Sequence, residues 1–286
     1  MPFSAVEVCA LPHTSKPDRA LCVSTHYFWI GVIVSVPHNL PMSNPALQNH
    51  LLAALPEAEY LPLKDKFEPV SLALGDVIYE SGDKLSHLYF PTTAIISLLY
   101  IMQNGGTAEI GIAGNNGLVG YALFMGGETT SSRAIVQIAG EAVRLKASEA
   151  KKAFAAGGRF QELLLRYIQS LITQISQTAV CNRLHSVEQQ LCRWLLINHD
   201  QLVTNKLVMT QELIANMLGV RREGVSVAAT HLQDRGVIKY ARGTISILDR
   251  KKLEAEACEC YQVVMDEYDR LLGEYIPTNR VKSISR

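Results

Sequence analysis

Residues 210–232 read TQELIANMLGVRREGVSVAATHL, and this segment indicates how the C-terminal part of the chain folds. Thr210 can cap a first helix, and Gly219 can end it because glycine readily adopts the left-handed conformation found after helices. A second helix is expected to begin at about Arg221. Its apolar residues recur every three or four positions: Val225, Ala228, Ala229 and Leu232. Two helices joined by a glycine turn predict a helix-turn-helix.

Two strand-like segments follow the second helix, at residues 237–240 and 244–248. They are joined by Ala241-Arg242-Gly243, which is short enough for a hairpin, so the pair predicts a small wing beside the helices. The alternative is a helical hairpin whose charged face is merely solvated. The order of helix, glycine turn, arginine-rich helix and glycine-tipped hairpin favours a winged helix-turn-helix.

The start of the second helix is the expected place for DNA recognition, because this turn enters the major groove and faces base edges. Arg222 can donate two hydrogen bonds to guanine O6 and N7, and Glu223 can accept one from cytosine N4. Ser226, one turn on, is within reach of a base or a phosphate. Other residues are better placed for backbone phosphates, which position a protein without reading sequence. These are Thr210, Gln211, Arg221, Lys239 and Arg242.

Short strands separated by turn residues are expected from about Leu63 to Leu145. The turns hold glycine next to Asp or Asn, as at Gly75-Asp76, Gly82-Asp83 and Asn104-Gly105. Short strands that follow one another at this spacing along the chain are typical of an antiparallel sandwich or barrel. We therefore expect a compact all-β domain ahead of the helices.

A long helix is expected after Ala147, because apolar residues recur at spacings of 4, 3 and 4. These residues are Leu164, Ile168, Leu171 and Ile175. The stripe predicts a coiled-coil-like seam with a second copy of the chain; packing against the chain's own β-domain is the alternative. Ser186-Val-Glu-Gln189 then fits a capping box, so a new helix begins there and residues 182–185 are a candidate hinge.

A final helix is predicted from a cap at Asp249, with one apolar face that extends to Leu271. Cys258 and Cys260 fall within it, about 200° apart around a regular helix, and so are not expected to ligate the same ion. We expect structural thiols there, with a redox-active cysteine as the alternative, and no metal or cofactor is predicted. The six cysteines of the chain are sparse and irregularly spaced, which favours a reducing cytoplasm over a secreted disulfide framework.

Composition excludes two simple kinds of protein. The 286 residues carry 27 Lys+Arg and 27 Asp+Glu, so the chain is neither a polybasic nucleic-acid coat nor an acidic disordered tail. Apolar residues make up 48%, enough for buried cores, and the length suggests two domains. Even within residues 207–250, basic residues outnumber acidic ones by only two. DNA binding is therefore predicted from the positions of a few basic side chains, and non-specific binding is expected to be weak.

Residues 1–41 differ from the rest, because they are rich in proline and hold an apolar run at residues 27–36. That run is about half of the ~20 residues needed to span a bilayer, so no membrane partner is expected. It resembles the hydrophobic region of a signal peptide, but no Ala-x-Ala-like cleavage site follows it. A clean helical pattern begins only after Met42. We hypothesise that synthesis starts at Met42 in the cell, and an intact mass that includes residues 1–41 would contradict this.

In these motifs the chain resembles the Crp/Fnr-type transcription regulators, over roughly residues 47–250. The likeness is carried by residues 210–226, by the turns at Gly75-Asp76 and Gly82-Asp83, and by Tyr89-Phe90. It implies an α+β fold with an N-terminal antiparallel β-roll of the cyclic-nucleotide-binding type, a long dimerisation helix and a C-terminal winged helix-turn-helix. The expected parts are an N-terminal extension (1–41), the β-roll sensor domain (42–155), the dimerisation helix (156–185), the DNA-binding domain (186–250) and a C-terminal helix and tail (251–286).

Departures from the family pattern affect both expected sites. Members that bind cyclic nucleotides carry a Gly-Glu pair and an Arg-Ser/Thr pair that hold ribose and phosphate, and this chain has Leu118 in the Glu position. Cyclic AMP is therefore not expected to be the effector. Arg133 can still pair with an anionic ligand, and the alternative is that its side chain is simply solvated. Arg221 replaces the usual Ser or Thr cap and Val227 a frequent Arg, which predicts a changed or weaker sequence preference. The candidate effector pocket comprises Gly117, Ser131, Ser132 and Arg133.

The sequence thus predicts a homodimeric, sequence-specific DNA-binding transcription regulator with an unidentified effector. Its expected partners are double-stranded DNA, a second copy of the chain, a small-molecule effector and RNA polymerase. A two-fold dimer matches a pseudo-palindromic site with half-sites about 34 Å apart. The alternative is a ligand- or protein-binding sensor that does not touch DNA. An enzyme is not expected, because the sequence shows no paired nucleophile and base, no HExxH and no phosphate-binding Gly-Lys-Ser loop.

Overall fold

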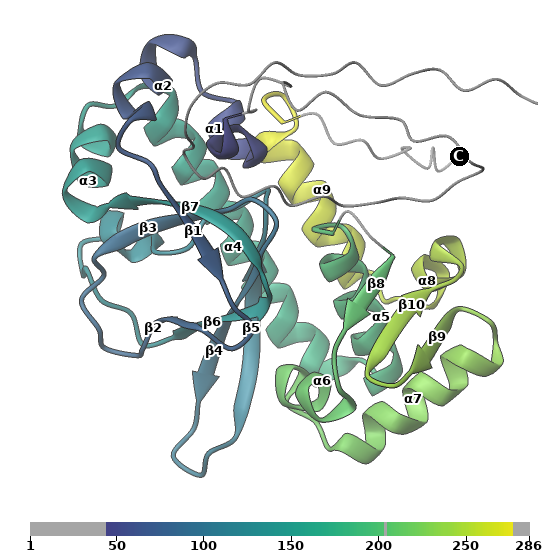
Figure 1. Ribbon diagram of the computed structural model, residues 1–286. Helices are drawn as coiled ribbons and strands as arrows, with labels where there is room; N and C mark the ends of the chain where they lie inside the picture. The colour runs from purple at the N-terminus through teal and green to yellow at the C-terminus, as the bar shows by residue number, and fades with distance from the viewer. Residues whose placement is uncertain (1–43, 203–204, 277–286) are drawn as a thin grey trace, which may run out of the picture. The chain divides into compact units, whose positions relative to one another are not determined.

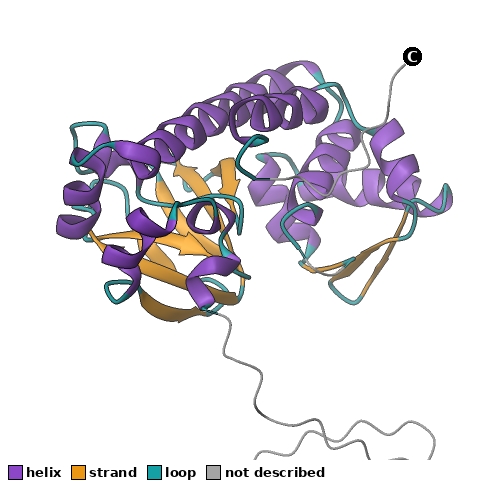
Figure 2. Ribbon diagram, turned by 90° about the horizontal axis from the view of Figure 1, so that it is seen from above, coloured by secondary structure: helices purple, strands orange, loops and turns teal. Residues whose placement is uncertain are grey.

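The computed structural model describes residues 44–202 and 205–276, which are coloured along the chain in Figure 1 and by element type in Figure 2. Three short helices come first, antiparallel strands follow over residues 68–146, and most of the other helices come after them, so the expected α+β class is confirmed. The hypothesis that synthesis starts at Met42, the apolar run at 27–36 and the tail after residue 276 fall outside the described residues. None of the described helices is long and apolar enough to cross a bilayer.

Two antiparallel sheets form the N-terminal part, with the strand orders β1-β7-β3 and β2-β6-β4-β5. The strands are β1 (Glu68–Leu72), β2 (Val77–Tyr79), β3 (His87–Pro91), β4 (Ile95–Ile101), β5 (Thr107–Ala113), β6 (Arg133–Ile138) and β7 (Gly140–Lys146). Gly75 and Gly82, in the turns on either side of β2, have φ of 87° and 88°, in the left-handed region that favours glycine. The predicted β-roll is therefore present.

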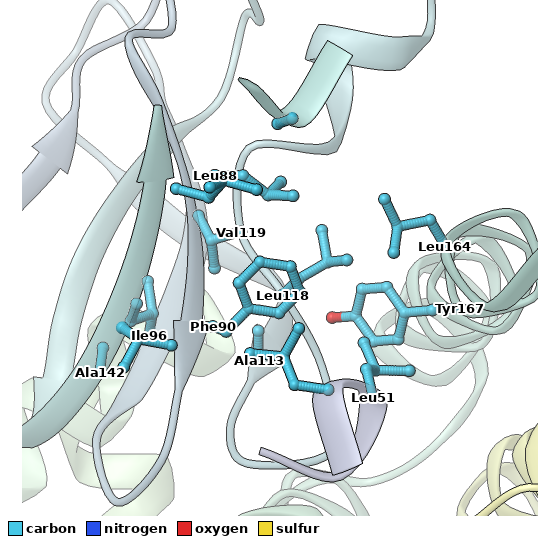
Figure 3. Close-up of a cluster of buried hydrophobic side chains, with 14 of the residues drawn as sticks. Leu51, Leu88, Phe90, Ile96, Ala113, Leu118, Val119, Ala142, Leu164 and Tyr167 are labelled. Atoms are coloured by element: carbon cyan, nitrogen blue, oxygen red, sulfur yellow. The ribbon is translucent and has the colours of Figure 1, made fainter. Parts of the chain in front are cut away.

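The core of this part is built from alternate strand positions and from helices. In β3 the side chains of Leu88 and Phe90 are fully buried, while His87 and Tyr89 are partly exposed. Figure 3 shows Phe90 and Leu118 facing Tyr167, which comes from the long helix α4 (Gly158–Leu184). Burial of each such large side chain contributes roughly 1.5–3 kcal/mol, so α4 is held to the sheets as part of the same core.

Short helices flank the strands, and polar side chains fix where they sit. Asn49 donates from Nδ2 to the carbonyl oxygens of Pro91 and Gly117, both at 2.9 Å, which pins the first helices to the sheets. The carboxylate of Glu59 accepts from two backbone N–H groups in the first turn of α4, at 2.9 and 2.8 Å. The flanking helices are η1 (Pro45–Gln48), α1 (His50–Ala53), α2 (Glu57–Lys64), η2 (Tyr121–Phe124) and α3 (Ala147–Ala155).

The stripe predicted as a dimer seam lies on α4 but faces the chain's own core. Leu164, Ile168 and Leu171 are only 1%, 6% and 3% exposed, and Ile175 packs against the same core. The prediction that these residues contact a second copy is therefore wrong, and the alternative of packing against the own chain is correct. Other apolar side chains of α4 are exposed instead. Leu165 and Ile172 each follow a buried leucine by one residue, and Val180 and Leu184 lie nearer the end of the helix. We call these four residues the exposed stripe of α4.

The C-terminal part holds the two helices of the helix-turn-helix, a preceding helix and a small sheet of order β8-β10-β9. The elements are α5 (Val187–His199), β8 (Lys206–Val208), α6 (Gln211–Leu218), α7 (Arg222–Asp234), β9 (Ile238–Ala241) and β10 (Thr244–Ile247). The predicted capping box is present at the start of α5, where Ser186 Oγ accepts from the N–H of Gln189 at 3.3 Å. Strand β8 was not predicted, because three residues are too few to show a period.

Two helices, not one, follow the wing: α8 (Arg250–Glu256) and α9 (Cys260–Leu272). Asp249 caps α8 as predicted, by accepting a 3.0 Å hydrogen bond from a backbone N–H in the first turn. Ala257 then has φ −75° and ψ 154°, an extended conformation that ends α8. The prediction of one regular helix through Cys258 and Cys260 is therefore wrong, and the two cysteines lie at a break between helices. Helix α9 continues alongside α4 (Figure 1).

Candidate nucleic-acid interface

Helices α6 and α7 form a tight helix-turn-helix around Gly219. This residue has φ 66° and ψ 32°, the left-handed conformation predicted for it, so the chain can turn sharply after α6. Thr210 caps α6 as predicted, since its Oγ1 accepts from the N–H of Leu213 at 3.2 Å. Ala215 and Ala228 are buried in the core that α6 and α7 share, where their small side chains allow the helices to approach closely.

One face of α7 is exposed and carries polar side chains near the N-terminal end. Arg222 and Glu223 are exposed and Ser226 is partly exposed, so all three predicted base-reading residues are accessible. At about 100° per residue they share this face with Val227 and Thr230, which are also exposed. We call these five residues the recognition face.

Val227 and Thr230 were not among the predicted base-reading residues. Val227 is 55% exposed, so an apolar side chain is available for contact with a thymine methyl group. The Thr230 hydroxyl donates to the carbonyl oxygen of Ser226 at 2.9 Å but retains acceptor lone pairs. Their signal in the sequence is the spacing of four residues from Glu223 and Ser226, which places each pair on the same side of a helix.

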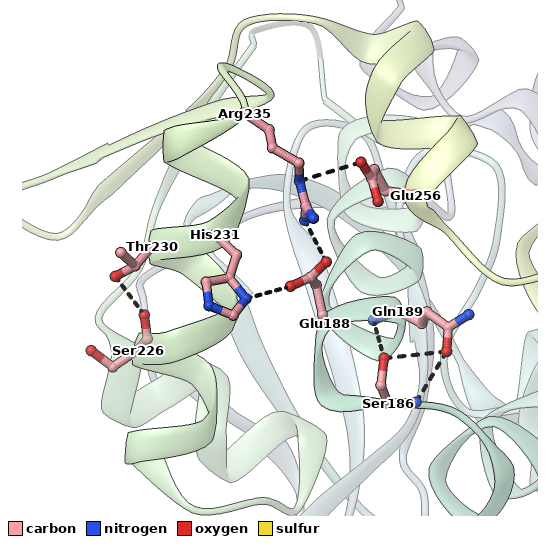
Figure 4. A network of polar contacts seen from close by, with 8 residues as sticks. All are labelled: Ser186, Glu188, Gln189, Ser226, Thr230, His231, Arg235 and Glu256. Carbon is pink, nitrogen blue, oxygen red and sulfur yellow. Dashed lines mark hydrogen bonds and ion pairs between the residues drawn. The ribbon is translucent and has the colours of Figure 1, made fainter.

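His231 and Arg235, further along α7, point toward α5 instead of the recognition face (Figure 4). Glu188 of α5 lies 3.1 Å from His231 Nδ1 and accepts a hydrogen bond from Arg235. Arg235 Nε also lies 3.3 Å from Glu256 of α8. Burial alone would raise the pKa of Glu188, but hydrogen bonds from Arg235 and His231 hold that pKa below its usual range. Both basic side chains therefore brace α7 within the chain.

The wing is a two-residue hairpin with Arg242 at its tip. Ala241 pairs with Thr244, and the intervening Arg242 and Gly243 have φ of 51° and 74°, both positive as a type I′ turn requires. The side chain of Arg242 is exposed. The N–H of Met209 donates to the carbonyl oxygen of Gly243 at 2.7 Å, which ties the wing to the segment that leads into α6.

Four of the five predicted phosphate contacts are exposed and Gln211 is partly exposed. Thr210 lies beside the wing tip: a Cβ added at Gly243 would be 4.0 Å from the methyl carbon of Thr210. Tyr240, next to the tip, interacts with both Gln211 and Arg222, so the start of α6, the wing and the recognition face adjoin one another. Lys239 precedes Tyr240 on β9 and therefore projects from the opposite face of the wing sheet, which sets it apart from the other four residues.

The residues predicted as an effector pocket have partners within the chain. Arg133 Nη2 lies 3.1 Å from Glu80 Oε1, so the guanidinium already pairs with a carboxylate. The hydroxyls of Ser131 and Ser132 lie 2.8 and 3.0 Å from neighbouring hydroxyl groups. Ser132 is also buried. Ser131 and Ser132 precede β6 and Arg133 begins it. Both hydroxyls and Arg133 Nη2 are engaged, whereas Arg133 Nε is buried without a hydrogen-bond partner.

Gly117, the fourth residue of the expected pocket, lies against helix α4. A Cβ at this position would be 2.5 Å from the Tyr167 hydroxyl oxygen, so only glycine permits this close approach. Leu118, which occupies the position of the expected carboxylate, is fully buried in the core beside Tyr167 (Figure 3). An apolar side chain at this position offers no acceptor for a ribose hydroxyl.

A buried carboxylate that was not predicted as functional connects β5 with α5. Glu109 accepts from Trp194 Nε1 at 2.8 Å and from Ser97 Oγ at 2.6 Å. Burial raises the pKa of Glu109 to about 7, although these hydrogen bonds favour the charged form. On the same strand, Thr107 Oγ1 lies 3.4 Å from the carbonyl oxygen of Asn216 in α6. Strand β5 thus contacts both helices that pack against α7.

Two family models match the chain, one over each part. The model described as a cyclic nucleotide-binding domain matches residues 69–156, and the model described as a Crp-like helix-turn-helix domain matches residues 189–256. No curated protein matches the sequence.

Solved structures share this architecture. One is described as a transcriptional regulator of the crp/fnr family from Eubacterium rectale: it is 18% identical, with 72% of this chain and 96% of that chain covered and a TM-score of 0.57. FixK2 from Bradyrhizobium japonicum is 16% identical, with coverage of 67% and 98% and a TM-score of 0.57. The c-di-GMP responsive global regulator CLP from Xanthomonas campestris is 14% identical, with coverage of 68% and 100% and a TM-score of 0.54. At these identities the likeness shows a common fold.

Proposed function

The chain belongs to the Crp/Fnr family of DNA-binding transcription regulators, and we propose that it binds a specific DNA site as a homodimer, under the control of an effector other than cyclic AMP. The observation that carries the proposal is the exposed recognition face of α7. The opposite face of α7 is buried in the C-terminal core, and the wing and the start of α6 adjoin the exposed face. This is the side of the helix that a major groove can accept.

Four residues of the recognition face have distinct roles in this proposal. Arg222 donates two hydrogen bonds to guanine O6 and N7, and Glu223 accepts one from cytosine N4. Ser226 contacts a base or a phosphate, and Val227 contacts a thymine methyl group. Backbone phosphates are contacted by Thr210, Gln211, Arg221, Lys239 and Arg242, which set position and register on the duplex.

The dimer contact is assigned to the exposed stripe of α4. Leu165 and Ile172 are each 51% exposed and lie seven residues apart, which is one heptad. Val180 and Leu184 continue the exposed apolar surface toward the end of the helix. Two copies of α4 packed about a two-fold axis would bury these side chains, and the two recognition faces would then meet half-sites about 34 Å apart.

The sensor role is assigned to the β-roll, residues 42–155, ahead of the dimerisation helix at 156–185 and the DNA-binding domain at 186–250. Two features support an effector other than cyclic AMP: Leu118 supplies no ribose acceptor, and the Arg133 guanidinium already pairs with Glu80. We further propose that the protein acts in a reducing cytoplasm and that RNA polymerase is one of its partners. No enzymatic activity is proposed.

Selection of bound duplexes from a random pool tests this proposal. We expect enrichment of a two-fold symmetric sequence, and comparison of selections with and without cell extract shows whether an effector is needed. The competing function is a ligand- or protein-binding sensor that does not contact DNA. An unenriched pool, together with duplex binding that shows no steep decrease with salt, would support that competitor, because phosphate contacts impose such a decrease.

A further inference from the structure

Four side chains of metal-ligating type converge where α4 ends. Cys181 and His185 come from the end of α4, and Cys258 and Cys260 come from the break between α8 and α9. Their ligand atoms, three Sγ and one ring nitrogen, all lie within 4.8 Å of one another. The three thiols are buried and the His185 side chain is mostly buried. We call these four residues the Cys3His cluster.

Two separations within the cluster are close to the edges of a tetrahedron around one zinc ion. Zinc–sulfur bonds of about 2.3 Å and zinc–nitrogen bonds of about 2.0–2.1 Å place two sulfurs about 3.8 Å apart and a sulfur and a nitrogen about 3.5 Å apart. Cys181 Sγ is 3.5 Å from Cys258 Sγ, and Cys260 Sγ is 3.6 Å from His185 Nδ1. We propose that the Cys3His cluster binds one zinc ion.

The backbone explains why both Cys258 and Cys260 can reach the same ion. On a regular helix they would point about 200° apart. The extended conformation of Ala257 ends α8, and α9 begins only at Cys260, so the two thiols are released from helical geometry. On α4, Cys181 and His185 are four residues apart, which places them on the same side of the helix end.

The surroundings of the cluster complete a zinc site. His185 Nε2 lies 3.3 Å from Glu259 Oε2, so donation of the Nε2 proton to this carboxylate leaves the Nδ1 lone pair facing the thiols. Zinc-bound histidines characteristically donate their second ring nitrogen to a carboxylate or carbonyl in this way. One zinc ion with three thiolates carries a net charge of −1. The buried Arg193 interacts electrostatically with Cys181 and Cys260, and so offsets that charge.

Four protein ligands leave no open coordination position, which makes the site structural and not catalytic. Cys181 and Cys258 are 77 residues apart in the sequence. A bound ion therefore fastens the end of α4 to the α8–α9 junction, beside the start of α5 at Ser186. This role is independent of DNA recognition, because none of the cluster residues belongs to the recognition face.

The zinc content of the full-length chain, purified under reducing conditions without added metal, tests the proposal. We expect about one zinc per chain, and an X-ray absorption spectrum fitted by three sulfurs and one nitrogen. The Cys258→Ser and Cys260→Ser variants should each lose most of this zinc. Cys192→Ser is the matched control, since Cys192 is an equally buried free cysteine that packs in the core around α5 and α7. That variant should retain its zinc.

A cobalt titration of the metal-free, reduced wild-type chain gives a second readout that needs no variant. We expect the visible absorption bands of tetrahedral cobalt–thiolate coordination, and their loss when zinc is added. Glu259→Gln should weaken zinc affinity by about tenfold without changing the stoichiometry. Wild-type protein with neither zinc nor the cobalt bands would overturn the proposal. So would equal zinc content in wild type and Cys258→Ser, or a Cys181–Cys258 disulfide in the native protein.

Discussion

The indole N–H of Trp194 donates to the carboxylate of Glu109 across 2.8 Å, in a buried contact between helix α5 and strand β5. Trp194 belongs to the same core as Val225 and Leu232, which form the buried side of α7. A hydrogen bond therefore joins the β-roll to α5, the helix that supports the recognition face. The group at the centre of this contact is titratable near neutral pH, because burial raises the pKa of Glu109 to about 7.

Glu109 is predicted to make stability depend on pH. Its pKa in the folded chain is about 7, above the ordinary value of 4.5, so the folded chain holds this proton more tightly than the unfolded chain does. The resulting stabilisation is complete below about pH 4.5 and is lost as the pH rises through about 7, and it amounts to roughly 3 kcal/mol. Glu109→Gln keeps a hydrogen-bond acceptor for Trp194, and its stability should not fall in this way as the pH rises. Denaturant unfolding of both proteins from about pH 5 to 8 checks this, and parallel stability curves would contradict it.

Ile172→Arg is predicted to separate the dimer. A charge placed in a seam between two copies of α4 is desolvated without a partner, which should cost about 3 kcal/mol and raise the dimer dissociation constant roughly 100-fold. Leu61→Arg is the control, because Leu61 is similarly exposed but lies on α2. Sedimentation equilibrium measures both variants. A dimer that is as stable in Ile172→Arg as in Leu61→Arg would place the interface elsewhere.

Arg242→Ala is predicted to weaken binding to all duplexes alike. Its side chain stands at the tip of the wing, where an interaction with a phosphate adds affinity without reading a base. Removal of one such interaction should make the slope of log affinity against log salt shallower by about 1. Titrations of a selected and a scrambled duplex at several salt concentrations provide the measurement. A decrease in affinity confined to the selected duplex would show that Arg242 reads a base.

Cyclic AMP is predicted to leave the thermal stability of the chain unchanged. A ligand that binds the folded state raises the melting temperature, so thermal unfolding reports binding directly. Here the Leu118 side chain fills the position of a ribose acceptor and Arg133 is paired with Glu80. A rise in melting temperature that increases with cyclic AMP concentration would show that the β-roll is a cyclic AMP site.

Local signals made the helix-turn-helix predictable from the sequence. The cap at Thr210, the left-handed Gly219 and the wing hairpin each depend on a few adjacent residues, and all three occur in the structure. The face of α7 was predictable for the same reason, since a helical period of 3.6 residues fixes which side chains lie opposite the apolar stripe. The same period also places Val227 and Thr230 on the face opposite the apolar stripe, so both could have been predicted.

Long-range contacts decided the features that the sequence did not reveal. Leu164 and Leu165 lie on neighbouring sides of α4, as do Leu171 and Ile172, and only the packing of α4 on the core shows which side is covered. The helix break at Ala257 carries no glycine or proline to mark it. The contact between Glu109 and Trp194 joins residues far apart in the chain, and so does the Cys3His cluster. No local sequence pattern predicts either of them.

The base preference of Arg222→Ala shows whether α7 reads bases in the major groove. Affinities are measured for the selected site and for duplexes in which each base pair of a half-site is changed in turn. Loss of a bidentate contact to guanine predicts a decrease of about 1–3 kcal/mol on the selected site and loss of preference at one base pair per half-site. Arg235→Ala, whose guanidinium bonds to Glu188 and Glu256, should keep the wild-type preference. Unchanged affinity and preference in Arg222→Ala would contradict the assignment of α7 to the major groove.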